Sequence, residues 1–470
     1  MWSQYILIIG ALTSICMAHI TSLYTFEPNW ENTHYARTID LSKGYVKETD
    51  LITVKNTVST PQREYYYMVN DGFDSVGELA IFSVVLGDQL VEVPFDEIVP
   101  NQVFKLELPV PVAPNSELEL RVNYVYIDKL EAVPQKLAKL EDVQQLLFKT
   151  NKFVYSPYPT RDYSMSLSGM TKGQEMELHI DDEVNATTTT TSLSPRVEGT
   201  SLKYGPLDSV VEPFTLKPMG LMYDHNRPLA KAISLNRSVW LPASNVNRIQ
   251  IEEYYELTNG GAQLSTGFSR VDWMKGRYEH TRNHWALSHL EIPLLSRKFD
   301  DYYYVDKVGV VSTHQIAQNH LILMPRFPLL GNWHYNFTLG WTEEMGEFVH
   351  QSNAQPDEFL IKLPLLNSVR DISYKDVYLE FYLPENAEFL GVASPVPYDS
   401  VVVDHELSYL DVAKGHVKVT VHYKNLFDDM HKVDVIVKYK YNPRSVLLKV
   451  FKISGFVFVG LISYYLLSIL

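Results

Sequence analysis

Strict alternation between apolar and polar residues recurs along this chain, and it constrains the fold more than any other feature of the sequence. Residues 117–126 read ELELRVNYVY, residues 417–424 read VKVTVHYK, and residues 432–441 read KVDVIVKYKY. A period of two places one set of side chains on a buried face and the other in water, as in a half-buried β-strand. The last two runs flank a polar stretch around Asp428 and Asp429, which predicts an antiparallel strand pair. The sequence therefore predicts a mostly β protein.

The composition fits this prediction and excludes other classes of protein. The 470 residues include 31 tyrosines, and tyrosine packs its ring on a sheet while its hydroxyl stays in water. The hydrophobic fraction of 46% and the charged fraction of 21% are ordinary globular values, and the length predicts two or three domains. The formal net charge of -15 disfavours a nucleic-acid partner, because binding to phosphates needs clustered Lys and Arg.

A short repeat suggests that the chain contains two similar halves. Residues 37–41 (RTIDL) resemble residues 237–241 (RSVWL), and each segment is followed by a predicted strand that ends at an asparagine, Asn56 or Asn259. Short apolar alternations also recur by chance, so coincidence is the alternative. A true repeat predicts two tandem β-sandwich-like lobes, over residues 19–220 and 221–445.

One helix and one exposed loop interrupt the predicted strands of the first lobe. Pro134 suits a first helical turn, and the apolar residues of 137–147 follow at 3-3-4 spacing, which predicts a short helical insert over 134–149, docked on a sheet. Residues 181–200 (DDEVNATTTTTSLSPRVEGT) are acidic and then threonine-rich, without an apolar period. We expect an exposed loop there, with room for an oligosaccharide on Asn185.

The N-terminal residues 1–18 read as a cleavable signal peptide. Residues 5–17 (YILIIGALTSICM) are apolar and uncharged, and the small residues Cys16 and Ala18 predict cleavage between Ala18 and His19. A buried helix or a membrane anchor is the alternative, although an anchor needs about 20 apolar residues. Because Cys16 is the single cysteine, the cleaved chain would contain neither a thiol nor a disulfide.

A second apolar run closes the sequence. Residues 453–470 (ISGFVFVGLISYYLLSIL) carry no charge, and at 1.5 Å per residue they span about 27 Å, near the thickness of an endoplasmic reticulum membrane. Lys449 and Lys452 precede this run, where their ammonium groups can reach the membrane surface. The serines of the run form no polar face, so we expect one transmembrane helix over 446–470 rather than a buried helix.

Two sequence signals conflict about the orientation of the chain in the membrane. The lysines before the apolar run favour a tail-anchored cytosolic protein by the positive-inside rule. Asn185, Asn236 and Asn336 each begin an Asn-x-Ser/Thr acceptor for N-glycosylation, which only a lumenal chain can use. Together with the signal peptide, these three sequons favour a single-pass type I protein with residues 19–445 in the lumen.

The sequence contains no convincing catalytic or metal-binding pattern. The histidines of residues 280–289 (HTRNHWALSH) include an i, i+4 pair, but no cysteine or carboxylate completes a familiar metal site. His405 begins a sequence like that of a zinc-protease helix, but Tyr409 stands where the second histidine is needed. There is no nucleophile elbow, P-loop or dinucleotide fingerprint. We therefore expect no catalytic residue, no metal site and no cofactor.

Several aromatic and proline-rich blocks are too specific for ordinary linkers, and they carry a resemblance to a known family. The blocks are residues 30–40 (WENTHYARTID), 252–259 (EEYYELTN), 267–270 (GFSR), 308–313 (VGVVST), 325–328 (PRFP) and 331–341 (GNWHYNFTLGW). In these blocks the sequence is similar to the ribophorin I family, in its fungal form, and the similarity is collinear from residue 30 to the membrane segment.

The resemblance implies a role in N-glycosylation. The family is the large lumenal subunit of the oligosaccharyltransferase complex, which transfers a dolichol-linked oligosaccharide to Asn-x-Ser/Thr of nascent proteins in the endoplasmic reticulum. Its implied role is non-catalytic: it holds the complex together and presents substrate. The implied partners are the other subunits, nascent polypeptides at the translocon and the membrane itself. Asn336 matches a glycosylated position of the family. Animal members continue past the membrane into a cytosolic domain that contacts ribosomes, whereas this sequence ends at Leu470, so the resemblance does not carry a ribosome-binding role over to it.

One alternative from another class of protein stays open at this point. A free-standing lumenal chaperone or lectin-like single-pass receptor would also combine β-rich lobes with one membrane helix. Such a protein would be a stable monomer in mild detergent, whereas a subunit would purify with partners.

Overall fold

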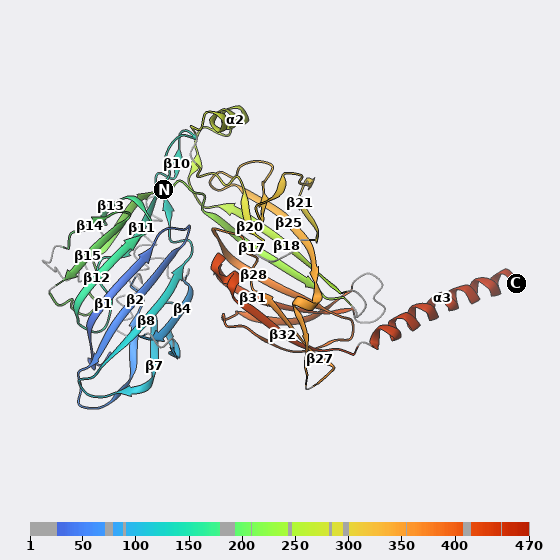
Figure 1. Ribbon diagram of the computed structural model, residues 1–470, viewed down its shortest axis with the longest axis horizontal. Helices are drawn as coiled ribbons and strands as arrows, with labels where there is room; N and C mark the ends of the chain where they lie inside the picture. Colours follow the sequence, from blue (N-terminus) through green and yellow to red (C-terminus); the bar gives the residue numbers. More distant parts are fainter. Residues whose placement is uncertain are drawn as a thin grey trace, which may run out of the picture. The chain divides into compact units, whose positions relative to one another are not determined.

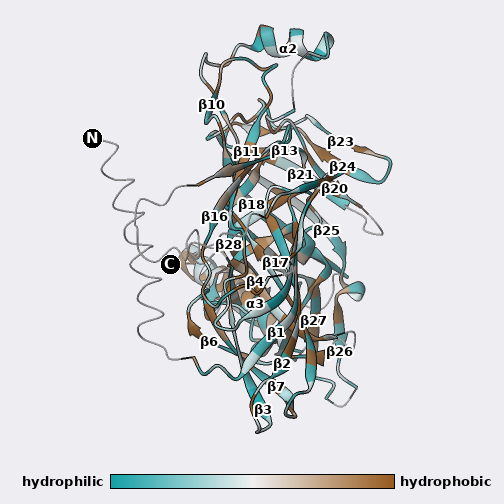
Figure 2. Ribbon diagram, turned by 90° about the vertical axis from the view of Figure 1, so that its left-hand side faces the viewer, coloured by the Kyte–Doolittle hydropathy of each residue, from teal (hydrophilic) through white to brown (hydrophobic). Residues whose placement is uncertain are grey.

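The computed structural model describes residues 26–469, except 71–78, 88–90, 179–192, 208, 243–246, 282–283, 295–299, 354, 408–414 and 443. The predicted signal peptide, its cleavage site at Ala18 and His19, and the sequon of Asn185 lie outside the described residues. The described part consists mainly of β-strands, which confirms the mostly β prediction (Figure 1). Figure 2 shows hydrophilic and hydrophobic residues alternating along many of these strands.

The chain divides into two compact units, and the boundary lies between Leu229 and Ala230 rather than after residue 220, which is inside a strand. Lobe 1 comprises the residues up to Leu229, together with Gly260–Ala286 and Leu330–Asn332. Lobe 2 comprises the remaining residues from Ala230 onward, including the C-terminal helix.

Lobe 1 is built on an eight-stranded sheet and two smaller sheets. The large sheet has the order β14 (Arg196–Glu198), β15 (Ser201–Leu207), β12 (Thr160–Ser168), β1 (Trp30–Asp40), β2 (Val46–Asn56), β8 (Glu117–Tyr126), β4 (Leu79–Leu86) and β5 (Val91–Glu92). One small sheet has the order β13 (Thr171–Glu177), β16 (Pro218–Asp224), β11 (Gln145–Asn151) and β9 (Glu131–Ala132). The other has the order β3 (Gln62–Met68), β7 (Val103–Val112) and β6 (Phe95–Val99).

Lobe 2 contains the same set of sheets. Its large sheet has the order β30 (Ser400–Glu406), β31 (His416–Phe427), β28 (Ile372–Leu383), β17 (Ala230–Trp240), β18 (Arg248–Asn259), β25 (His334–Glu344), β21 (Asp300–Asp306) and β22 (Gly309–Val310). Its small sheets are β29 (Glu388–Ala393), β32 (Asp434–Lys440), β27 (Glu358–Pro364) and β26 (Val349–Gln351), and β20 (Leu290–Pro293), β24 (His320–Leu323) and β23 (His314–Ala317).

The two lobes are a structural repeat. Strand for strand, the three sheets of lobe 2 follow the orders of lobe 1, and the large sheets share one parallel pair, β1 with β12 and β17 with β28. The remaining neighbours in these sheets pair antiparallel in both lobes. The repeated segments 37–41 and 237–241 cover the ends of β1 and β17, the matching central strands, and the first residue after each. The repeat suggested by the sequence is therefore confirmed.

The predicted helix over 134–149 is wrong. That segment forms β10 (Lys136–Leu137), which pairs with β19 (Gln263–Leu264), then a turn, and then β11. The carboxylate of Asp142 accepts hydrogen bonds from the main-chain N–H groups of Ala138 and Lys139, at 3.0 and 2.8 Å, and so stabilises a turn in place of a helix. The short helical insert of lobe 1 is instead α2 (Arg270–Tyr278), whose N-cap Ser269 accepts from the N–H of Asp272.

Two further predictions need correction, the pairing of two alternating runs and the loop over 181–200. The runs near residues 417 and 432 form β31 and β32, as expected for strands, but the two strands belong to different sheets. The 3-10 helix η4 (Asp428–Lys432) carries the chain from one sheet to the other, and Asp428 is buried in it. The segment predicted as a loop over 181–200 is described from residue 193 onward, and its end contains the short exposed strand β14.

Candidate functional site

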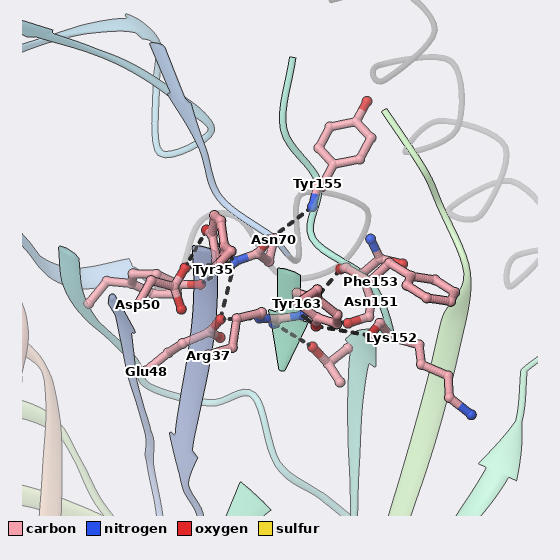
Figure 3. A network of polar contacts seen from close by, with 12 residues as sticks. Tyr35, Arg37, Glu48, Asp50, Asn70, Asn151, Lys152, Phe153, Tyr155 and Tyr163 are labelled. Carbon is pink, nitrogen blue, oxygen red and sulfur yellow. Dashed lines mark hydrogen bonds and ion pairs between the residues drawn. The ribbon is translucent and has the colours of Figure 1, made fainter. Parts of the chain in front are cut away.

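The most distinctive site in lobe 1 is a buried arginine centre, drawn in Figure 3. The guanidinium of Arg37, on β1, lies 2.7 Å from the carboxylate of Glu48, on β2, and neither side chain is exposed. Arg37 also donates to the carbonyl oxygen of Asn151 at 2.6 Å and to the hydroxyl of Thr150 at 3.1 Å. Since both residues belong to β11, Arg37 ties the large sheet to the small sheet beneath it.

A second carboxylate lies beside this ion pair. Asp50 is fully buried, and its Oδ2 accepts hydrogen bonds from Tyr35, Tyr67 and Asn70 at 2.6, 2.7 and 2.9 Å. Its Oδ1 has no hydrogen-bond partner among the described residues. Burial and the negative charge of Glu48 raise the pKa of Asp50 to about 8, against the attraction of Arg37. Asp50 is therefore mostly protonated at neutral pH, because Arg37 already neutralises Glu48.

Lobe 2 repeats the centre in a simpler form. Arg237, on β17, lies 3.2 Å from the carboxylate of Glu253, on β18, and donates to the carbonyl oxygen of Pro364 at the end of β27 at 2.8 Å. Tyr255 and Asn367 donate to the same carboxylate at 2.8 and 3.2 Å. Both centres are closed to solvent. Their ion pairs and hydrogen bonds therefore join two sheets, and a substrate cannot reach them.

The two described sequons lie on one face of the large sheet of lobe 2. Asn236 and Asn336 are half-buried, and each precedes a buried residue of its strand, Arg237 or Phe337, on the opposite face. Asn236 pairs in register with Tyr254, whose hydroxyl accepts a hydrogen bond from the Asn336 side chain at 3.0 Å. The structure therefore brings together two of the three predicted modification sites, although they are 100 positions apart in the sequence numbering.

The histidines considered as metal ligands do not form a metal site in the described part of the chain. His280, His284 and His289 are exposed and lie beyond the end of α2. Among residues that the structure describes, no group of three or more His, Cys, Asp or Glu side chains is placed to hold a metal ion. His405 and its neighbour Glu406 belong to strand β30, not to a helix, and Tyr409 lies outside the described residues.

The C-terminal helix α3 (Ser445–Ile469) fits the predicted membrane segment. Its residues Lys449–Ile469 are long and apolar enough to cross a membrane, and no part of that window is buried in the protein. The ammonium group of Lys449 lies 3.3 Å from the buried carboxylate of Glu385, which precedes β29. Lys449 therefore joins the base of the helix to lobe 2 instead of extending only toward a membrane surface.

Two of the sequence blocks that carry the family resemblance have a clear structural purpose. Arg326, from the PRFP block, pairs with Asp306 at 2.5 Å and donates to the carbonyl oxygens of Gly309 and Val310 at 3.1 and 3.0 Å. It thereby fixes the β21–β22 hairpin. Gly331, from the GNW block, passes so close to the main chain of Ala262 that a Cβ atom there would collide with it.

Comparison with known proteins identifies the family of this chain. The ribophorin I family model matches residues 30–468, which include both lobes and almost all of α3. The chain belongs to the ribophorin I family.

Among the similar relatives of this ribophorin I chain is the dolichyl-diphosphooligosaccharide--protein glycosyltransferase subunit 1 of Caenorhabditis elegans, which is 26% identical over 92% of this chain and 71% of that protein. The protein of the same name from Schizosaccharomyces pombe is 25% identical over 92% of this chain and 93% of its own length. Subunit 1A of Arabidopsis thaliana is 25% identical over 75% of this chain and 54% of its length.

Sequence reasoning found some of these residues and missed others. It identified the repeated segments that contain Arg37 and Arg237, but not the carboxylates that face them. Glu48 and Asp50 are two positions apart on β2, so their side chains lie on the same face of the strand. That this face lies beside Arg37 became clear only from the pairing of β1 with β2.

Proposed function

We propose that this chain is a non-catalytic subunit of an oligosaccharyltransferase complex, and that it supports N-glycosylation by holding the complex together and presenting acceptor polypeptides. The observation that carries the proposal is the unbroken family match over residues 30–468, through both lobes and the membrane helix. The relatives named above are subunits of a protein glycosyltransferase, and two of them match over 92% of this chain.

The buried ionisable groups support the non-catalytic part of the proposal. The ion pairs of Arg37 with Glu48 and of Arg237 with Glu253 are buried in the cores of lobe 1 and lobe 2, and Asp50 is buried beside the first. A general acid or base must reach its substrate, so a sealed centre is suited to stability and not to proton transfer. This agrees with the non-catalytic role that the resemblance to the family implies.

The placement of both lobes in the lumen of the endoplasmic reticulum belongs to the same proposal. Asn236 and Asn336 are on a solvent-facing side of the lobe 2 sheet, where an attached oligosaccharide leaves the core intact. A type I orientation with α3 in the membrane allows these sequons, and Asn185, to be glycosylated. The partners in this account are the other subunits and nascent polypeptides at the translocon.

Rapid depletion of this protein, in cells of the organism from which it comes, tests the proposal. We expect secreted glycoproteins to appear with unoccupied sequons, while the dolichol-linked donor accumulates because its consumption falls. Unchanged occupancy of the sequons would overturn the proposal. A free-standing chaperone or lectin-like receptor would instead leave the donor pool unchanged and cause secreted proteins to misfold with their glycans attached.

A further inference from the structure

The edge strand β30 differs from every other edge strand that the structure describes. The remaining edge strands are either four residues or shorter, or carry a register shift in their pairing. Strand β30 is seven residues long and pairs with β31 in continuous register, from Ser400 with His422 to Glu406 with His416. Long regular edges are usually avoided, because their outward N–H and C=O groups accept a strand from another chain.

The side chains of β30 leave this edge open. Val402 and Val403 are 56% and 48% exposed, and all residues of the strand except Val401 are exposed. Only the end of the strand is protected, since the N–H of His405 donates to its neighbour Asp404 at 2.7 Å. The valine segment therefore combines an accessible main chain with apolar side chains, the two features of strand addition.

The structural repeat provides a comparison within the same molecule. The strand of lobe 1 that matches β30 is β14, which also lies at the end of its sheet beside β15, the counterpart of β31. Strand β14 has only three residues, and two of them, Arg196 and Glu198, are charged. One lobe thus has the short, charged edge that prevents strand addition, whereas the other has a long edge with three consecutive valines.

The charges around β30 indicate what kind of strand can pair with it. Residues 399–407 (DSVVVDHEL) contain three carboxylates and no Lys or Arg. Asp399 lies 3.1 Å from Lys424 and Glu406 lies 3.3 Å from Lys418, both on β31, so Asp404 is the carboxylate that can face an added strand. A second copy of this chain would bring two such acidic segments together, so self-association through β30 is disfavoured. An extended polypeptide with alternate apolar residues and a Lys or Arg opposite Asp404 would be complementary.

We propose that β30 binds an extended segment of an acceptor polypeptide by adding it as a further strand to the large sheet of lobe 2. This inference rests on the proposed function, because it names how that subunit presents its substrate. Recognition through main-chain hydrogen bonds suits acceptors of many sequences, since every non-proline residue supplies the same N–H and C=O groups.

Site-specific crosslinking in the intact membrane complex tests the proposal. A photo-reactive benzoyl-phenylalanine is placed at Val402, and at Val197 of β14 as the matched control, which is 74% exposed. The probe is a biotinylated peptide, Lys-Thr-Val-Asn-Val-Thr-Lys, compared with the same peptide N-methylated at alternate residues and with a version flanked by Glu. We expect the first peptide to label position 402 and not 197, and each main-chain hydrogen bond lost to N-methylation to weaken binding about fivefold.

A variant with the opposite charge at position 404 distinguishes strand addition from nonspecific contact. In the Asp404→Lys variant, labelling by the Lys-flanked peptide should fall and labelling by the Glu-flanked peptide should rise. Equal labelling by the N-methylated peptide, equal labelling at Val197, or crosslinking of position 402 only to a fixed subunit would overturn the inference. Each of these results leaves the subunit assignment intact if the tagged chain still purifies with the complex.

Discussion

The buried carboxyl of Asp50 leads to the most specific prediction about stability. Arg37 lies 2.7 Å from Glu48, so a second negative charge on Asp50 has no cation of its own. The pKa of Asp50 is raised to about 8 by burial and by Glu48, whereas an exposed aspartate in the unfolded chain has a pKa of about 3.9. Between these two values the folded protein holds a proton that the unfolded chain releases, and stability must therefore fall as the pH rises.

The magnitude follows from the linkage of proton binding to folding. One proton difference changes the free energy of unfolding by about 1.4 kcal/mol per pH unit, so lobe 1 loses on the order of 4 kcal/mol between about pH 5 and about pH 8 from this group. Replacing Asp50 by asparagine removes the titrating group while keeping its shape. We expect the Asp50→Asn variant to lose this part of the pH dependence and to be more stable than the wild type near pH 8.

Pulse proteolysis in urea measures the free energy of unfolding of the full chain in detergent at several pH values, with fragments of lobe 1 detected. Tyr67→Phe is the matched control, because it removes a hydroxyl that donates to Asp50 at 2.7 Å but leaves the number of carboxyl groups unchanged. It should lower stability by about 1 kcal/mol without removing the pH dependence. The same pH dependence in Asp50→Asn as in the wild type would show that Asp50 is charged in the folded protein, and would refute the reasoning.

Three further predictions follow from named contacts. Arg37→Met should destabilise lobe 1 by about 3–5 kcal/mol. The loss should exceed that of Arg237→Met in lobe 2, because Arg37 also donates to Asn151 and Thr150 whereas Arg237 donates to Pro364; thermal melts compare both variants, and equal losses would contradict this. Gly331→Ala should cost about 1–3 kcal/mol, since its Cβ meets the main chain of Ala262; an unchanged melting temperature would show that this close approach is absent. Asn336→Gln should increase the gel mobility of the membrane-bound chain by one oligosaccharide, and an unchanged mobility that also resists glycosidase would mean that the site is unoccupied.

Alternation in the sequence predicted where strands form more reliably than which strands pair. The run 117–126 is strand β8 over the same residues, with Leu120, Val122 and Tyr124 buried as the period of two requires. The runs that became β31 and β32 were also strands. Their separation into two sheets was not predictable, because alternation determines which face is buried but not which neighbour supplies the hydrogen bonds.

The helix prediction failed for a local reason, and a real helix was missed. Four apolar residues at helical spacing were outweighed by the carboxylate of Asp142, which satisfies the N–H groups of a turn. In α2, Ser269 and Asp272 form a capping signal three residues apart, which the sequence displays but which has little apolar periodicity beside it. Figure 2 shows α2 as mainly hydrophilic, in keeping with a helix that lacks a strong apolar stripe.

The sequence alone predicted only part of the two buried arginine centres. The repeat of Arg37 and Arg237 at matching places was found, and it does mark matching strands of two lobes. Asp50 and Glu253 face these arginines across β1–β2 and β17–β18, and each lies six positions before the asparagine that ends its strand, Asn56 or Asn259. The repeat therefore contained a signal for them, but the two carboxylates differ in type and lie 13 and 16 positions after their arginines, so which residue faces which became clear only from the strand register.

Purification of the chain under native conditions tests the central claim most directly. The membrane is solubilised in mild detergent, the tagged chain is isolated, and transfer of oligosaccharide from a dolichol-linked donor to an Asn-x-Thr peptide is measured in the eluate. We predict transfer activity and a constant ratio of this chain to the other subunits, with activity lost when the chain is stripped of its partners. The account would be contradicted if the chain purified as a monomer without transfer activity and the membranes kept full transfer activity after the chain was removed.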